Sequence, residues 1–202
     1  MTKIRSICVY CGSSPGKDNA YLDAARTLGN AMGRAGLRLV YGGGAKGIMG
    51  AVAHATAEAG GNVMGIIPRF LMNKEASEAA LARLDEVVVT EDMHARKHRM
   101  FEESDAFVAL PGGIGTLEEI VEIMTWAQLG RHRKPMVFGN VGGFWNPMMA
   151  LMDHMKHEGF LHSAHLVQPL LVDDPADILP AVLGSASGHK NPTGHDYIID
   201  RL

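Results

Sequence analysis

The amino-acid sequence predicts an α/β fold in which an open, mostly parallel sheet carries helices on both faces. Short β-branched runs alternate with longer segments of helical period, which is the pattern of parallel strands joined by crossover helices. Three glycine-rich segments each follow a predicted strand directly, as in Rossmann-like sheets. The length of 202 residues, with 47% hydrophobic and 20% charged residues, suits one globular domain with a sizeable core.

Each predicted element follows from its local pattern. Strands are expected where apolar and β-branched residues cluster, at residues 6–10, 37–41, 63–67, 86–89, 106–110, 135–138 and 170–172. Helices are expected where apolar residues recur with helical period, at residues 19–35, 48–59, 93–103, 116–128, 145–158 and 176–183. Gly36, Gly60 and Gly159 follow three of these helices, where glycine commonly ends a helix. We expect one domain over residues 1–183 and a flexible tail over residues 184–202.

Charge and composition exclude several classes of protein. Lys and Arg number 19 against 22 Asp and Glu, and the net charge of −3 argues against a broadly basic surface that binds nucleic acid. No apolar run approaches the roughly 20 residues of a membrane helix, and the N-terminus lacks the pattern of a signal peptide. The 2 cysteines are too few for a disulfide-stapled secreted scaffold. We therefore expect a cytoplasmic protein that binds neither nucleic acid nor a membrane.

The two cysteines form a Cys8-x-x-Cys11 pair with the spacing of a redox motif. A redox pair of this spacing needs its first thiolate at the N-terminus of a helix. Cys8 instead lies inside the first predicted strand, and Cys11 lies just after it. We therefore expect buried or loop cysteines rather than a redox centre.

Two of the three glycine-rich loops match known phosphate-binding motifs only in part. Gly42-x-Gly44-x-x-Gly47 fits the dinucleotide fingerprint, but Ile66-Ile67-Pro68 stands where an acidic residue, about 20 positions on, would bind a ribose hydroxyl. NAD binding is not expected, and tight turning with helix–sheet packing is the alternative explanation of these glycines. Residues 12–18 are one residue too short for a P-loop and have Asp18 where Ser or Thr must bind magnesium, so an NTPase is not expected.

The third loop, Pro111-Gly112-Gly113-Ile114-Gly115-Thr116, follows a strand and leads directly into a helix. Consecutive free N–H groups, the helix dipole and the Thr116 hydroxyl would together form an anion-binding nest that suits a monophosphate. Glu118, Glu119 and Glu122 follow within the first two turns, close to any bound phosphate ester. These acids have two explanations: catalysis on the ester, or helix capping, because Thr116-x-x-Glu119 is also a capping box.

The predicted helix that begins at Met93 carries five cationic or titratable side chains, which are His94, Arg96, Lys97, His98 and Arg99. Just after a strand, such a cluster can hold a phosphate or the ring of a nucleotide, and the alternative is a solvated helix face. His94 and His98 share one helix face. The Glu of a His-Glu-x-x-His motif and a third ligand are missing, so no metal site is expected.

Two motifs taken together, Met93-His94-Ala95-Arg96-Lys97 and Pro111-Gly112-Gly113-Ile114-Gly115-Thr116-Leu117-Glu118-Glu119, resemble the paired signature of the Lonely Guy (LOG) family of cytokinin riboside 5'-monophosphate phosphoribohydrolases. The resemblance continues through residues 125–130 and 140–145 and covers nearly the whole chain up to about Asp173. Members are also labelled lysine decarboxylases, but nothing in this sequence marks a lysine that would bind pyridoxal phosphate.

The resemblance implies hydrolysis of the N-glycosidic bond between an adenine-type base and ribose 5'-monophosphate, with no cofactor and no metal. It implies that Arg96 and Glu119 are the catalytic pair. The substrate-binding positions that it implies are Glu75, Met93, Lys97, Gly112, Gly113, Ile114, Gly115, Thr116 and Thr125. It also implies a homodimer with the site near the subunit contact.

The chemistry of this bond suits the two implied catalytic side chains. Cleavage passes through an oxocarbenium-like ribosyl cation, so the Glu119 carboxylate can stabilise the charge and orient or deprotonate the attacking water. Arg96 can offset negative charge on the departing base, or it can fix the phosphate and ribose. Two alternatives stay open: a broader purine or pyrimidine 5'-monophosphate nucleosidase, and a non-catalytic nucleotide or cofactor carrier on the same fold.

Overall fold

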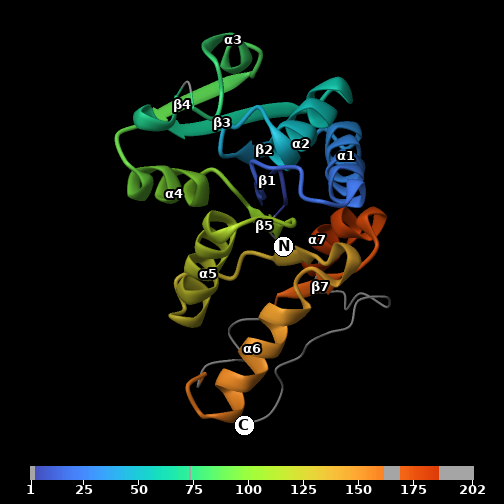
Figure 1. Ribbon diagram of the computed structural model, residues 1–202, viewed down its shortest axis with the longest axis vertical. Helices are drawn as coiled ribbons and strands as arrows, with labels where there is room; N and C mark the ends of the chain where they lie inside the picture. Colours follow the sequence, from blue (N-terminus) through green and yellow to red (C-terminus); the bar gives the residue numbers. More distant parts are fainter. Residues whose placement is uncertain (1–2, 73, 162–168, 187–202) are drawn as a thin grey trace.

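The computed structural model describes residues 3–72, 74–161 and 169–186, and it confirms the predicted α/β class. All strand pairs are parallel, and the strand order is β4-β3-β2-β1-β5-β6-β7 (Figure 1). The strands are β1 (Ser6–Tyr10), β2 (Arg38–Tyr41), β3 (Asn62–Pro68), β4 (Glu86–Thr90), β5 (Ala106–Ala109), β6 (Met136–Gly139) and β7 (Leu170–Val172). Apolar β-branched runs bury both faces of the central strands, as expected for a sheet covered by helices on two sides.

The helices divide between the two faces of the sheet (Figure 1). One core cluster joins the sheet to α1 (Asn19–Arg34), α2 (Gly47–Glu58) and α7 (Ile178–Ala186). The other joins it to α4 (Met93–Glu102), α5 (Ile114–Gln128) and α6 (Asn146–His157). Strand residues alternate between the clusters, so that Ile7 and Val9 belong to the first and Cys8 and Tyr10 to the second.

Short helical elements account for most departures from the predicted element list. The segment between β3 and β4 contains the 3-10 turn η1 (Arg69–Leu71) and the short helix α3 (Glu78–Leu81), neither of which the sequence predicts. Further 3-10 turns are η2 (Val141–Gly143) and η4 (Pro175–Asp177), the latter directly before α7. Helix α7 continues through Gly184 to Ala186, where the sequence predicts the start of the tail, and residues 187–202 lie outside the described residues.

The two cysteines are free and buried, which confirms the expectation for the Cys8-x-x-Cys11 pair. Burial raises the pKa of both thiols well above its usual range, so neither thiolate is available near neutral pH. Among the residues that the structure describes, no helix combines the length and apolar character required to cross a membrane.

The strand order reverses between β1 and β5, and the loops that follow these strands meet there. The N–H of Gly12, in the loop after β1, donates to the carbonyl of Pro111, in the loop after β5, at 3.1 Å. Ligands of open α/β sheets bind at such a switch point, beyond the carboxyl ends of the strands. The fold therefore places the third glycine-rich loop at the expected binding edge.

Candidate active site

Helix α5 has an open N-terminus. Gly113 is its N-cap, no side chain caps it, and the first N–H that bonds back to the loop is that of Leu117, to the Gly113 carbonyl at 3.1 Å. Within the described residues, the N–H groups of Ile114, Gly115 and Thr116 have no hydrogen-bond partner. These donors and the helix dipole make the start of α5 suited to an anion.

A cavity of about 220 Å³ lies at this edge, between the loop after β1 and the loop after β5. Gly12, Ser13, Ser14, Gly16, Pro111, Gly112 and Gly113 line it, together with Tyr21, Ile48 and Phe144. A side chain at position 112 would fill the junction, because its Cβ would lie 2.1 Å from Thr116 Oγ1 and 2.9 Å from the Gly12 nitrogen. Gly112 therefore keeps the approach to α5 open.

The capping-box interpretation of Thr116-x-x-Glu119 is wrong. Helix α5 begins at Ile114, so Thr116 is its third residue and not its N-cap. Glu119 is buried, and its side chain faces α4 rather than the helix start. The carboxyl of Glu119 therefore does not cap α5, and its charged partner is Arg96 on α4.

Arg96 and Glu119 face each other across the α4–α5 contact. Nη1 of Arg96 lies 3.5 Å from Oε1 of Glu119, and both residues are buried, with 5% and 8% of their surfaces exposed. Nε of Arg96 donates to the Ile66 carbonyl at 3.1 Å, and Nη2 donates to the Gly42 carbonyl at 3.4 Å. Met93, on the same helix, places its sulfur 3.6 Å from Nη1. The guanidinium is thus held from several sides.

Burial raises the pKa of Glu119 to about 7. The nearby Arg96 acts in the opposite direction, the Glu118 and Glu75 carboxylates raise the pKa further, and Lys97 lowers it. The Glu119 carboxyl therefore titrates near neutrality, where it can both give and take a proton. Such a displaced pKa in a polar pair at a binding edge is typical of a functional carboxyl.

Glu75 supplies an unused acceptor on the same side of the site. Its Oε2 is buried and has no hydrogen-bond partner, while its backbone carbonyl accepts from the N–H of Ala45 at 3.1 Å. The negative charge of Glu75 raises the pKa of Glu119, so the two acids lie near each other. A buried acceptor without a partner is costly, and a ligand donor would satisfy it.

Lys97 bridges α4 to α5. Its Nζ contacts Oε1 of Glu118 and lies 3.2 Å from Oε2 of Glu122. Burial lowers the pKa of Lys97, but the bonds to the two carboxylates outweigh it and the pKa is raised. Two of the three acids that follow the α5 loop thus hold Lys97, and Glu119 is left for Arg96.

Other members of the predicted set lie apart from this pair. Thr125 is exposed, and its hydroxyl donates to the carbonyl of Val121 in the same helix at 2.8 Å. His94, His98 and Arg99 are exposed on α4, so the solvated-face explanation holds for these three side chains. Within the described residues, no group of His, Cys, Asp or Glu side chains could hold a metal ion.

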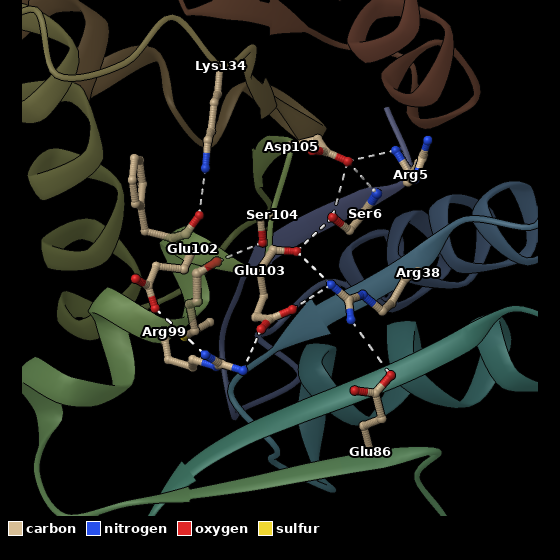
Figure 2. A network of polar contacts seen from close by, with 12 residues as sticks. Arg5, Ser6, Arg38, Glu86, Arg99, Glu102, Glu103, Ser104, Asp105 and Lys134 are labelled. Atoms are coloured by element: carbon tan, nitrogen blue, oxygen red, sulfur yellow. Dashed lines mark hydrogen bonds and ion pairs between the residues drawn. The ribbon is translucent and has the colours of Figure 1, made fainter. Parts of the chain in front are cut away.

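A polar network fixes the C-terminal end of α4 (Figure 2). The carboxylate of Glu103 accepts from Arg38 at 2.7 Å and from Arg99 at 2.6 Å. The backbone carbonyl of Glu103 accepts from the Ser6 hydroxyl at 2.7 Å. Lys134 donates to the Phe101 carbonyl at 2.7 Å. Cations and hydroxyls thereby satisfy the last carbonyls of the helix. At the other end, the Asp92 carboxylate accepts from the Ala95 N–H at 2.7 Å, so the helix that carries Arg96 is capped at both ends.

The other glycine-rich junction, before α2, is closed. The N–H groups of Ile48 and Met49 both donate to the Gly12 carbonyl, at 3.1 and 3.2 Å. Gly47 has a φ of +58°, and a Cβ there would lie 2.4 Å from the Ser13 carbonyl oxygen. Close packing and a left-handed turn therefore explain this glycine, and two of the first three N–H donors of α2, those of Ile48 and Met49, are used within the protein.

Another cavity, of about 650 Å³, lies between α2 and residues 77–84. Small apolar residues of α2 and α3 line much of it, including Ala53, Ala57 and Ala80. None of Arg96, Lys97 and Glu119 lines this cavity. Its size alone does not make it the site of the chemistry.

The sequence analysis missed two backbone partners of Arg96, the carbonyls of Gly42 and Ile66. In the sequence, Ile66 stands near the position where a dinucleotide-binding protein would have an acidic residue, and this gives no indication that its carbonyl binds Arg96. Both residues lie at or just after the carboxyl ends of β2 and β3, where groups of neighbouring parallel strands converge. That position is the one signal in the sequence that could have pointed to them.

Comparison with known proteins identifies the family of the chain. The family model for a possible lysine decarboxylase matches residues 49–182. The cytokinin riboside 5'-monophosphate phosphoribohydrolase LOG3 of Arabidopsis thaliana is 49% identical over 160 residues, which are 79% of this chain and 73% of the relative. The phosphoribohydrolase LOG of Oryza sativa subsp. japonica is 47% identical over 160 residues, 79% of this chain and 65% of the relative.

Solved structures share the fold at lower identity. The molybdenum cofactor carrier protein from Chlamydomonas reinhardtii superposes with a TM-score of 0.66 at 23% identity, over 92% of this chain and 99% of that one. At this identity the likeness concerns the fold alone. Because the family model covers more than half of the chain and the LOG proteins match most of it, the chain belongs to the LOG family, the family of the possible lysine decarboxylase model.

Proposed function

We propose that this chain hydrolyses the N-glycosidic bond of cytokinin riboside 5'-monophosphates and related adenine nucleotides, releasing the free base and ribose 5-phosphate. One observation carries the proposal: a single helix, α5, begins with three N–H donors that have no partner in the described part of the chain, and it carries, farther along, a buried carboxyl that faces a buried guanidinium. The named activity of relatives at 47% and 49% identity supports it.

The start of α5 would bind the 5'-phosphate. Its N–H groups point away from the helix toward the loop edge, and Gly113 and Gly115 have open space where a Cβ would stand. A phosphate held there does not react, but its binding energy orients the ribose. This anchoring makes the monophosphate, rather than the free nucleoside, the substrate.

Glu119 would act at the anomeric carbon. With a rise of about 1.5 Å per residue, its Cα stands roughly 5–8 Å along the helix from the phosphate donors, so a ribose bound at its phosphate extends toward it. As a carboxylate it stabilises the ribosyl cation and takes a proton from the attacking water. A pKa of about 7 leaves this form abundant at neutral pH.

Arg96 would complete the pair. Its guanidinium keeps Glu119 partly ionised despite burial, and it can offset charge that gathers on the departing base. The buried Oε2 of Glu75 would accept a hydrogen bond from the substrate. Met93 and Lys97 support this region from α4, Met93 against the guanidinium and Lys97 through Glu118 and Glu122.

We also propose a homodimer that covers the outer face of α5. Ile114, Val121 and Leu129 expose 81%, 41% and 70% of their surfaces there, and Thr125 shares this face. Light scattering of the purified chain should give twice the mass of one chain, and a monomer at micromolar concentration would contradict it. The cytoplasmic location stays a prediction.

The direct test is to incubate the purified full chain with isopentenyladenosine 5'-monophosphate and with AMP, and to separate the products by chromatography. We expect free base and ribose 5-phosphate, with far slower release from the matching nucleosides that lack phosphate. Release from no purine or pyrimidine monophosphate would contradict the proposal. A higher kcat/KM for the prenylated nucleotide would distinguish cytokinin activation from a broad nucleosidase.

A further inference from the structure

Gly42, the first glycine of the fingerprint before α2, has an unassigned role. It follows β2 directly, and a Cβ built on it would lie 2.0 Å from Nη2 of Arg96 and 3.2 Å from Cζ. Real Cβ atoms essentially never approach other atoms within 3.0 Å. The guanidinium therefore occupies the space that any other residue at position 42 would need for its side chain.

Three contacts and its burial hold the Arg96 guanidinium in place. Its Nε donates to the Ile66 carbonyl at 3.1 Å, its Nη2 donates to the Gly42 carbonyl at 3.4 Å, and its Nη1 lies 3.5 Å from Glu119. Arg96 is only 5% exposed. A displacement of about 1 Å, the least that would relieve the contact, changes several of these distances together.

We propose that Gly42 is a positioning residue for the reaction: the absence of a side chain at this position determines where the Arg96 guanidinium stands beside Glu119. The inference rests on the proposed function for its catalytic consequence. This role also explains why the first position of the fingerprint is a glycine although no dinucleotide is expected to bind. The residue after β2 packs against the Arg96 side chain of α4.

The electrostatic consequence follows from the groups that surround Glu119. Arg96 and Lys97 face it from α4, Glu118 lies beside it on α5, and Glu75 faces it from the segment after η1. The buried Cys8, Tyr10 and Cys11 of the β1 side are neutral, because burial raises the pKa of each well above its usual range. Arg96 is the strongest influence that lowers the Glu119 pKa, so moving it raises that pKa.

Gly44 provides a matched control two residues farther along the same loop. A Cβ there would lie 3.0 Å from the sulfur of Met49, in a flexible side chain, and its three nearest atoms all belong to Met49. Neither Gly42 nor Gly44 has a positive φ, so alanine fits the backbone at both positions. The two substitutions add the same methyl group and differ in what it meets.

The experiment compares Gly42→Ala with Gly44→Ala, and repeats Gly42→Ala in an Arg96→Ala background. We expect Gly42→Ala to lower kcat about 10- to 100-fold, as a misplacement of about 1 Å near the reacting atoms does, with little change in KM. The pH midpoint of kcat should move upward, whereas Gly44→Ala leaves both quantities near wild type. Gly42→Ala should lower the thermal unfolding midpoint in the wild-type background and not in Arg96→Ala.

Wild-type kcat and pH midpoint in Gly42→Ala would overturn the proposal. An equal loss of thermal stability in both backgrounds would overturn it too, because the glycine would then act through something other than Arg96. If Gly42→Ala does not fold, recovery of folding in the double variant supports the proposal, and failure of the double variant where Arg96→Ala folds contradicts it. If the wild type releases no base, the proposed function fails, while the stability comparison still tests the contact.

Discussion

Two glycine-rich junctions lie at the same edge of the sheet, one before α2 and one before α5, and they are used differently. At α2, the Gly12 carbonyl accepts from the N–H groups of Ile48 and Met49. At α5, the first N–H groups have no partner among the described residues. A strand, a glycine-rich loop and a helix therefore make a phosphate site only where the rest of the fold leaves the helix donors unpaired.

The side chains in the second turns of α2 and α5 also differ: those of Val52 and Ala53 in α2 are apolar, and that of Glu119 in α5 is ionisable. The second turn of α2 carries Val52 and Ala53, which pack in the core. The second turn of α5 carries Glu119, which is buried against Arg96. In our proposals, the first junction leaves space for the guanidinium of Arg96, and the second junction binds the phosphate and carries Glu119.

The largest effect should come from Glu119→Gln, which removes the ionisable group of α5 and keeps its shape. We expect kcat to fall about 100-fold or more while nucleotide binding is retained, because general acid–base groups typically contribute this much. Steady-state kinetics and calorimetric titration measure the two quantities. Glu58→Gln is the control that should keep wild-type activity, because Glu58 is exposed on α2 and pairs with His54 of the same helix. Near-normal turnover in Glu119→Gln would contradict a catalytic role for Glu119 and would indicate that the residue is structural.

A methyl group at Gly112 should weaken the α5 junction as a binding site. Its Cβ would lie 2.1 Å from Thr116 Oγ1 and 2.9 Å from the Gly12 nitrogen, so the loop must shift. We expect KM for the nucleotide to rise about 10- to 100-fold, as the loss of one or two charge-assisted hydrogen bonds would produce. Gly44→Ala in the α2 junction should leave KM unchanged. Equal effects of both substitutions would remove the distinction between the junctions.

The pH dependence should follow the carboxyl of α5. Burial raises the Glu119 pKa to about 7, so the carboxyl becomes protonated as the pH falls through that value. Because we propose that the carboxylate form of Glu119 acts in the reaction, we expect kcat to fall about tenfold per unit below pH 7 and to level off above it. Initial rates across a buffer series provide the measurement. A rate that rises as the pH falls from 8 to 6 would instead make protonated Glu119 the working form.

The smallest effect on the reaction should come from Gly47→Ala, which disturbs the packed junction. The residue has a φ of +58°, and its Cβ would lie 2.4 Å from the Ser13 oxygen, so we expect a loss of about 1–3 kcal/mol in the free energy of unfolding. The kcat of the folded protein should change little. Gly36→Ala is the control, because Gly36 has a similar φ of +64° but a Cβ there would have no atom within 4 Å. Its smaller loss in the free energy of unfolding gives the cost of backbone strain alone, without the steric clash. Denaturant unfolding compares the two.

Much of the fold could be predicted from the sequence, because long periodic segments and buried strands have strong local patterns. Strand β1 (Ser6–Tyr10) and strand β7 (Leu170–Val172) agree with the predicted ranges. The segment between β3 and β4 could not be predicted, because helix α3 (Glu78–Leu81) is too short to show a period. The start of α5 was placed too late, at Thr116, because Gly113 caps the helix with its backbone alone and Ile114 and Gly115 are not typical first-turn residues.

For the candidate site, the resemblance to the LOG family paired Arg96 with Glu119, and the two side chains lie 3.5 Å apart. Their roles in catalysis stay a proposal. The sequence could not tell that, of the cationic residues of α4, Arg96 is buried while His94 and Arg99 are exposed, since this depends on which helix face meets the sheet. Nor could it tell which N–H donors other loops occupy, because those bonds join residues far apart in the chain.

The central claim, that α5 is open to a phosphate and α2 is closed, is tested most directly by titrating ¹⁵N-labelled protein with ribose 5-phosphate. We expect saturable shifts of the Ile114, Gly115 and Thr116 amide resonances, and unchanged resonances for Ile48 and Met49. Shifts confined to Ile48 and Met49, or no shift at either helix start at millimolar ligand, would contradict it.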